Sequence, residues 1–190
     1  MSKHITKTIN MTLCALFTAL IAVGAFIRIP VPYMPITLQT FFVLLSGMFL
    51  GARWGAVSAG LYMVLGLVGL PVFTEGGGLW YVLKPGFGYI MGFVIGAFVT
   101  GKILKSMKSN TLKNRFLAGI AGLAVIYIIG ILYACMISHF YLGITLSVRT
   151  IVIFYFLLLI PGDMVLCFLS AYISGKLIPV LSDKRKIVRP

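Results

Sequence analysis

Residues 86–104 read GFGYIMGFVIGAFVTGKIL, and this stretch sets the architecture that we expect for the whole chain. Lys102 is its single charged residue, and its length is close to the roughly 20 apolar residues that cross a bilayer as a helix. Gly88, Gly92 and Gly96 recur at every fourth position, so they form one row on a helix surface. Because small residues at this spacing let membrane helices approach closely, the row predicts tight packing against another helix.

Similar apolar stretches fill most of the sequence. The composition is 61% hydrophobic and 10% charged, whereas a soluble domain carries about 25% charged residues. We therefore predict an all-α integral membrane protein with a single transmembrane domain over residues 1–190. The six predicted transmembrane helices are residues 8–27, 36–52, 54–70, 86–104, 116–142 and 162–181.

Two parts of this pattern are less regular. The second and third spans are short and nearly continuous, joined at residues 51–55. The segment 148–160 is apolar but too short to span a membrane alone, and it is bounded by Arg149 and by Pro161. We place it at the outer membrane surface or as a partly inserted helix. A separate crossing by this segment would move the C-terminus to the other side of the membrane.

The basic residues lie at the ends of the predicted spans, although the formal net charge is +13. This distribution argues against nucleic-acid binding, which needs basic residues gathered on one face. If the N-terminus is cytoplasmic, cytoplasmic segments hold 13 of the 16 Lys and Arg residues and outer segments hold 3. Because excess Lys and Arg mark the cytoplasmic side, we predict that both termini are cytoplasmic.

An enzymatic function has little support in this sequence. Catalysis requires a nucleophile, an acid–base pair or metal ligands placed together, and the candidate residues are few and scattered. They are His4, His139, Glu75, Asp163, Asp183, Cys14, Cys135 and Cys167. The cysteines lie in apolar stretches, where we interpret them as packing residues. We therefore expect no catalysis, no metal site and no cofactor.

Polar residues gather at the outer ends of the predicted helices. The first outer loop, residues 28–35, contains three prolines and leads into the second span with Thr37 and Gln39. Asp163 begins the last span at the same face. An Asp at this position is a good N-cap, but a carboxylate at the membrane boundary is also a functional candidate.

The second outer loop, residues 70–85, has a different composition. Gly77 and Gly78 belong to a run of three glycines, whose backbone can come close to a ligand. Trp80 and Tyr81 supply flat apolar walls with polar tips, although an interfacial aromatic belt is an alternative role for both. Because both outer loops and the start of the last span meet at one face, we predict a ligand pocket there.

Five short strings, in this order along the chain, carry a resemblance to a known family. They are residues 36–39 (ITLQ), 66–73 (GLVGLPVF), 76–78 (GGG), 87–93 (FGYIMGF) and 161–163 (PGD). Together they resemble the biotin-specific substrate-binding subunit, or S component, of energy-coupling-factor transporters, which are ABC transporters. The resemblance covers residues 11–178, which is nearly the whole chain.

This resemblance implies a function and a set of partners. It implies a six-helix substrate-binding domain in the prokaryotic plasma membrane, with outer loops that cover a pocket for biotin. The implied protein partners are a membrane-embedded coupling subunit and two ATPase subunits, which would drive uptake. Ala15 and Ala19 could be simple packing residues, but they match the family's Ala-x-x-x-Ala docking pair on the first helix.

The resemblance also assigns site residues. Asp163 corresponds to the family's ligand-bonding Asp, and Gln39 and Tyr89 match motif positions near the site. The sequence departs from the family at Leu166, where Lys is common, and Lys84 is our candidate for the missing cation. The predicted ligand-binding residues are therefore Gln39, Gly77, Gly78, Trp80, Tyr81, Lys84, Tyr89 and Asp163.

Two alternatives stay open at this point. The chain could bind another small vitamin or acid, which equilibrium binding with a ligand panel would reveal. It could also be a membrane scaffold without a ligand, in which case no small molecule would raise its thermal stability.

Overall fold

The computed structural model describes residues 2–31, 35–107, 109–144 and 147–187, with side chains described between residues 7 and 177. Residues 32–34 of the predicted first outer loop lie outside this part, as do Lys108 and Arg189 among the predicted cytoplasmic cations. The six longer helices are α1 (Ser2–Phe26), α2 (Gln39–Leu50), α3 (Ala52–Leu67), α4 (Phe87–Ser106), α5 (Leu112–Phe140) and α7 (Ile160–Ile187). The shorter elements are β1 (Arg28–Ile29), β2 (Ile36–Thr37), the 3₁₀ turn η1 (Leu79–Leu83), α6 (Val148–Thr150) and the π-helical segment η2 (Ile151–Leu157). The prediction of a helical chain with six main helices is confirmed.

The second helix starts later than the sequence predicts. Ile36 and Thr37 pair with Ile29 and Arg28 in the antiparallel hairpin of β2 and β1, and the next backbone N–H, that of Leu38, donates to the Ile27 carbonyl at 3.0 Å. Because these backbone groups are used by the hairpin, the predicted start at residue 36 is wrong. The 12-residue helix α2 is only about 18 Å long, which is shorter than the roughly 30 Å core of a bilayer.

The junction between α2 and α3 is a tight corner at one glycine. Gly51 has a φ of +82°, a conformation that residues with a Cβ adopt only with strain. Beyond the corner, a Cβ on Gly55 would lie 2.8 Å from the Cα of Gly47. The two helix backbones are therefore in contact directly after the turn.

The glycine row of α4 packs against α5, as predicted. A Cβ on Gly88 would lie 2.4 Å from the Tyr133 Cβ, and one on Gly92 would lie 2.9 Å from the Ile126 carbonyl oxygen. A Cβ on Gly96 would lie 2.5 Å from the Ile126 side chain. These separations leave no room for larger residues, so the row fixes how closely α4 and α5 approach.

Residues 148–160 extend the last helix and form no separate crossing. Only Leu158 and Leu159 separate η2 from α7, and Val148–Leu177 is one apolar helical stretch of 30 residues. Pro161 lies in the first turn of α7, where a missing N–H is tolerated. The start of α7 at Ile160 lies within two residues of the predicted start at residue 162, and the segment before it continues the same apolar helical stretch.

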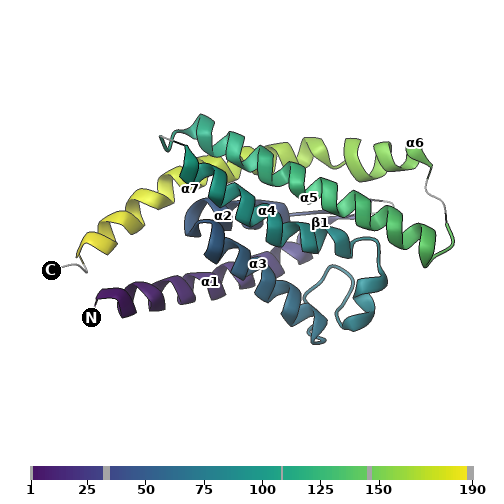
Figure 1. Cartoon of the computed structure of the whole chain (residues 1–190), viewed down its shortest axis with the longest axis horizontal. Coiled ribbons are helices and arrows are strands. Elements are labelled where there is room, and N and C mark those ends of the chain that lie inside the picture. The colour runs from purple at the N-terminus through teal and green to yellow at the C-terminus, as the bar shows by residue number, and fades with distance from the viewer. Residues whose placement is uncertain (1, 32–34, 108, 145–146, 188–190) are drawn as a thin grey trace.

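The helices run side by side along the long axis of the molecule (Figure 1). Both chain ends lie at one end of the bundle, while η1 and α6 lie at the other. Four helical stretches are long and apolar enough to cross a membrane, namely Lys7–Phe26, Phe87–Ser106, Leu112–Phe140 and Val148–Leu177. The fold is that of a multi-pass membrane protein in which η1 and α6 lie at the end remote from the termini.

Candidate ligand-binding site

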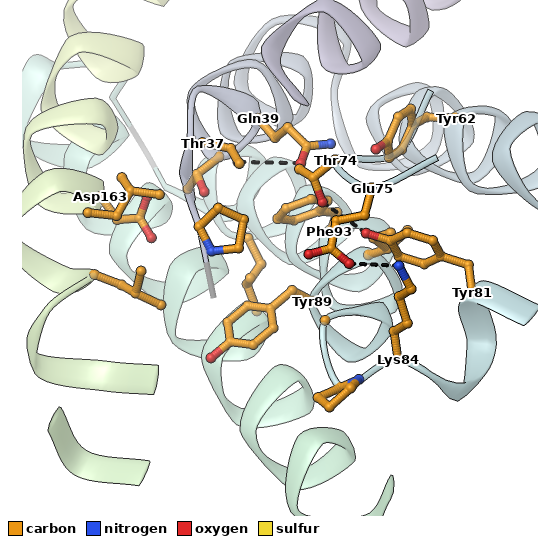
Figure 2. Close-up of a pocket in the computed structure, with 18 residues that line it drawn as sticks. Thr37, Gln39, Tyr62, Thr74, Glu75, Tyr81, Lys84, Tyr89, Phe93 and Asp163 are labelled. Atoms are coloured by element: carbon orange, nitrogen blue, oxygen red, sulfur yellow. Dashed lines mark hydrogen bonds and ion pairs between the residues drawn. The ribbon is translucent and has the colours of Figure 1, made fainter. Parts of the chain in front are cut away.

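A cavity of about 260 Å³ lies among the ends of the helices that are remote from the termini (Figure 2). Its volume is just below the roughly 300–1,000 Å³ typical of small-molecule sites, so it suits a small ligand. Its lining contains both polar and apolar residues and comes from both predicted outer loops and five helices. The lining residues are Pro35, Ile36, Thr37, Gln39, Thr40, Tyr62, Thr74, Glu75, Tyr81, Lys84, Pro85, Gly86, Tyr89, Ile90, Phe93, Ile126, Leu159 and Asp163.

Asp163 is buried in the wall of this cavity, with 9% of its surface exposed. Its backbone N–H donates to the Leu159 carbonyl at 3.0 Å, so it lies inside the helix and the predicted N-cap role is wrong. The Tyr127 hydroxyl donates to Oδ2 at 2.7 Å, and Thr40 lines the same cavity. The Tyr127 hydroxyl orients the carboxylate and leaves acceptor capacity for a ligand.

Gln39 carries a polar group without a partner among the described residues. Its side chain is buried, and its Oε1 accepts from the Thr37 hydroxyl at 3.3 Å. Its Nε2 is also buried and makes no hydrogen bond of good geometry among the described residues, although the Tyr62 hydroxyl lies close to it. An unpaired buried donor costs free energy on the order of 1–3 kcal/mol. Because Gln39 lines the cavity, a ligand acceptor would satisfy this amide.

The second outer loop is fixed by an aromatic anchor. Phe73 is 1% exposed, and its ring fills the space beside Gly66, where a Cβ would lie 2.0 Å from the ring. Phe73 and Gly76 exchange backbone hydrogen bonds of 2.9 and 3.3 Å, which close a tight turn around Thr74 and Glu75. The anchored ring therefore holds the tip of this turn over the cavity.

Tyr81 connects η1 to the same turn. Its ring packs on Phe73 with centroids 4.5 Å apart, and its hydroxyl lies 2.9 Å from the Thr74 Oγ1. Burial raises the pKa of Tyr81, so this phenol stays neutral and serves as a hydrogen-bonding wall. Tyr81 therefore forms part of the cavity wall.

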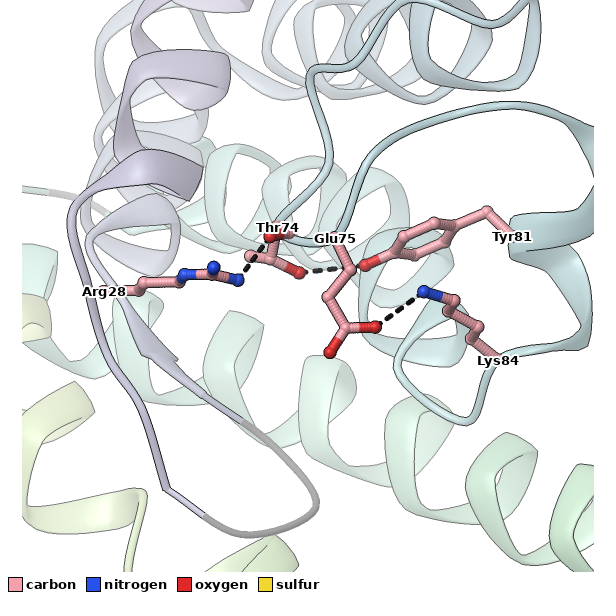
Figure 3. Close-up of polar contacts among 5 residues, drawn as sticks. All are labelled: Arg28, Thr74, Glu75, Tyr81 and Lys84. Atoms are coloured by element: carbon pink, nitrogen blue, oxygen red, sulfur yellow. Dashed lines mark hydrogen bonds and ion pairs between the residues drawn. The ribbon is translucent and has the colours of Figure 1, made fainter.

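Lys84 lines the cavity but already has a partner. Its Nζ lies 2.7 Å from Oε2 of Glu75, and 5.0 Å from the centre of the Tyr81 ring (Figure 3). Arg28, on β1, donates to the Thr74 carbonyl and so connects the first outer loop to the second. No sequence signal indicates that Glu75 pairs with Lys84, because the pairing depends on the closed turn around Thr74 and Glu75.

Three predicted site residues lie outside the cavity lining. Trp80 is 80% exposed and points away, which matches the alternative role of an interfacial aromatic residue. A Cβ on Gly77 would lie 2.1 Å from the Leu70 carbonyl oxygen, and Gly78 has a φ of +103°. The Gly78 N–H donates to the Gly66 carbonyl at 2.7 Å. The glycines therefore let the loop backbone fold onto the end of α3. The backbone that they approach closely belongs to the protein itself, whereas the sequence predicts a close approach to a ligand.

Tyr89 lies at the cavity, and its hydroxyl donates to the Tyr155 carbonyl in η2 at 3.0 Å. Sequence reasoning missed Tyr62, Thr40 and Tyr127, of which the first two line the cavity and the last holds Asp163. The sequence signal for these three residues was a polar side chain within an apolar helix. This signal does not say whether the side chain points into a cavity, because that direction depends on how the helices pack.

The remaining prediction concerns the first helix. Ala15 and Ala19 are exposed, whereas Cys14, Phe17 and Thr18 on the opposite face are buried against the bundle. The pair therefore faces away from the other helices. Leu166, where the resemblance expects Lys, lies outside the cavity lining.

The fold and the cavity together define a class of protein: a multi-pass helical membrane protein with a small-molecule site at one end of its helices. The model of the BioY family matches residues 1–183. The chain belongs to the BioY family.

Named relatives agree with this assignment. A probable biotin transporter BioY from Lysinibacillus sphaericus is 41% identical over 95% of this chain and 92% of its own length. The biotin transporter BioY from Rhizobium etli is 33% identical over 88% of this chain and 92% of its own length. The crystal structure of an S component for biotin from an ECF-type ABC transporter superposes with a TM-score of 0.80 at 28% identity, covering 90% of this chain and 92% of that one.

Proposed function

We propose that this chain binds biotin on the extracytoplasmic side of a prokaryotic plasma membrane and takes part in its uptake as the S component of an ECF-type ABC transporter. The observation that carries the proposal is the cavity in which Asp163 and the unpartnered amide of Gln39 both form part of the wall. Membership of the BioY family, whose named relatives are biotin transporters, supports the identity of the ligand.

The polar head of biotin matches the two buried groups. Its ureido ring has two N–H donors and one carbonyl acceptor. The Asp163 carboxylate, oriented by Tyr127, accepts from one of the ring N–H groups. The Gln39 Nε2 donates to the ring carbonyl and so gains the partner that it lacks in the described residues. Pairing both groups at once is favourable because each is costly to leave unpaired when buried.

The opposite side of the cavity suits the tail of biotin. Asp163 and Lys84 lie on different sides of the cavity (Figure 2), and Tyr81, Tyr89 and Phe93 line the space with them. The aromatic rings cover the apolar chain, and the Lys84 ammonium meets the terminal carboxylate. This arrangement gives Lys84 the role of the cation that Leu166 cannot provide.

Transport requires energy from other chains under this proposal. The partners are a membrane-embedded coupling subunit and two ATPase subunits, and this chain catalyses no reaction. The exposed pair Ala15 and Ala19 forms a shallow strip on α1 where another helix can approach closely. The docking strip is therefore separate from the cavity, which lies towards the other end of the helices.

Equilibrium binding tests the proposal directly. The purified chain is examined for co-purified biotin and then titrated with biotin, thiamine and riboflavin after removal of any bound ligand. We expect saturable 1:1 binding of biotin alone, accompanied by a rise in Tm. Saturable binding of another vitamin in preference to biotin, or no ligand-dependent rise in Tm, would contradict the proposal.

A further inference from the structure

The ion pair of Glu75 and Lys84 has a consequence for ligand selection. Both residues line the cavity, and with Asp163 they are the charged residues of its lining. Their side chains are 55% and 43% exposed, so they lie at the open part of the cavity. The Glu75 carboxylate is therefore already paired with the Lys84 ammonium, which is the cation that a ligand carboxylate would need.

Each residue of the ion pair is positioned by a separate structural feature, a backbone turn for Glu75 and an aromatic ring for Lys84. Glu75 lies in the turn that is closed by Phe73, whose ring is buried beside α3. The Lys84 ammonium lies near the face of Tyr81, which in turn packs on Phe73. The backbone turn around Glu75 and the aromatic contact of Lys84 therefore bring the two charges to within 2.7 Å in the ligand-free structure.

We propose that Glu75 is a specificity-determining residue that opposes the ligand's carboxylate by competing for Lys84. This inference rests on the proposed function and adds a residue that acts against binding of the anion. A ligand carboxylate that reaches Lys84 meets a pair with no net charge and is repelled by Glu75. A neutral ligand tail meets no such opposition. Glu75 thereby lowers the affinity for a ligand with an anionic tail and leaves the affinity for a ligand with a neutral tail nearly unchanged.

The expected sign is unusual for a residue that lines a binding site. Glu75→Gln keeps the size of the side chain and removes the negative charge, so biotin should bind about three- to tenfold more tightly at low salt. The gain should shrink at high ionic strength, because exposed charges are screened. Biotinamide, whose carboxylate is replaced by a neutral carboxamide, should change by less than about twofold, since its tail carries no charge.

A double-mutant cycle gives a second readout. Lys84→Met leaves Glu75 unpaired beside the ligand carboxylate, so it should weaken biotin more than the Glu75→Gln, Lys84→Met double variant does. Lys102→Met is the matched control, because Lys102 is also exposed and lies 5.8 Å from the centre of the Phe98 ring, but near the other end of α4. This control should leave both affinities unchanged.

The affinities of biotin and biotinamide are measured by titration calorimetry on the full purified chain at low and high salt. Tighter binding of biotin alone in Glu75→Gln, reversed by salt, supports the inference. Unchanged biotin binding in Glu75→Gln, or equal loss for both ligands, overturns it and gives Glu75 a role in loop structure. Failure of the unmodified chain to bind either ligand refutes the proposed function itself, so the two failures are distinguishable.

Discussion

Replacing Asp163 by Asn tests the centre of the proposed site. The substitution keeps the size of the side chain but replaces an acceptor-only carboxylate by a group with one acceptor and one donor. In the structure the carboxylate is buried and already accepts from Tyr127 at 2.7 Å. The remaining acceptor capacity faces the cavity, and the Asn side chain can supply only part of it.

The size of the effect follows from the type of hydrogen bond. A hydrogen bond to a charged group contributes about 1.5–3 kcal/mol, and each tenfold change in affinity corresponds to about 1.4 kcal/mol. Asp163→Asn should therefore weaken biotin binding by about ten- to a hundredfold. The affinity of the purified protein for biotin, measured by titration calorimetry, gives this number directly.

Asp163→Asn should not lower the stability of the ligand-free protein, although it weakens biotin binding. A buried carboxylate within a membrane helix is costly to desolvate, and the described hydrogen-bond partner of Asp163 is the neutral Tyr127 hydroxyl, with no positive side chain paired to it among the described residues. Asp163→Asn removes this charge, so the Tm of the ligand-free protein should stay the same or rise. Weaker binding without loss of stability is the signature of a ligand-contacting residue.

The matched control for this prediction is Ser174→Ala. Ser174 is also fully buried on α7, but its hydroxyl bonds the Ala171 carbonyl and lies 3.6 Å from the Met48 sulfur, away from the cavity. This variant should bind biotin normally. Unchanged biotin affinity in Asp163→Asn would refute the reasoning, as would a parallel loss of affinity and Tm, since Asp163 would then act only in folding.

Three further predictions concern the topology, the docking strip and the loop. A cysteine at Leu79, which is 74% exposed, should react with a membrane-impermeant reagent from outside intact cells, and one at Lys105 should react only after permeabilisation. The double substitution of Ala15 and Ala19 by Trp should abolish biotin uptake by cells that contain the coupling subunits while leaving biotin binding intact, because the strip is separate from the cavity. Gly77→Ala should destabilise the protein by about 1–3 kcal/mol, because the new Cβ would lie 2.1 Å from a carbonyl oxygen.

Controls for these three experiments separate each expected effect from an unspecific one. The labelling uses a chain without its native cysteines, and reaction of the Leu79 position only from inside would reverse the topology. Ala124→Trp places one Trp at an exposed position of α5 and should permit uptake. Normal uptake by the α1 double variant would contradict the docking role of Ala15 and Ala19. Gly60→Ala meets nothing within 4 Å and should be neutral or stabilising, so equal Tm values for the two glycine variants would argue against the clash.

The helices and their closest packing could be read from the sequence, because both depend on local patterns. A long apolar stretch must satisfy its backbone hydrogen bonds internally and so forms a helix in a membrane. The row of Gly88, Gly92 and Gly96 needs only helical periodicity to form one face, and the structure places this face on α5. The late start of α2 was missed because it depends on pairing between Ile36 and Ile29 across a loop.

The site itself was predicted only in part, because side-chain direction depends on tertiary anchors. Adjacent residues such as Trp80 and Tyr81 have similar local signals, yet Tyr81 lines the cavity and Trp80 is 80% exposed. Tyr81 packs on the buried Phe73 ring, so its direction follows from this tertiary contact. The partner of Asp163 is Tyr127, 36 residues away on another helix. The sequence thus determined that several polar residues lie near the helix ends remote from the termini, because their positions along the chain follow from the apolar stretches. The packing of helices and loops decided which of them share a cavity and which charges are already paired.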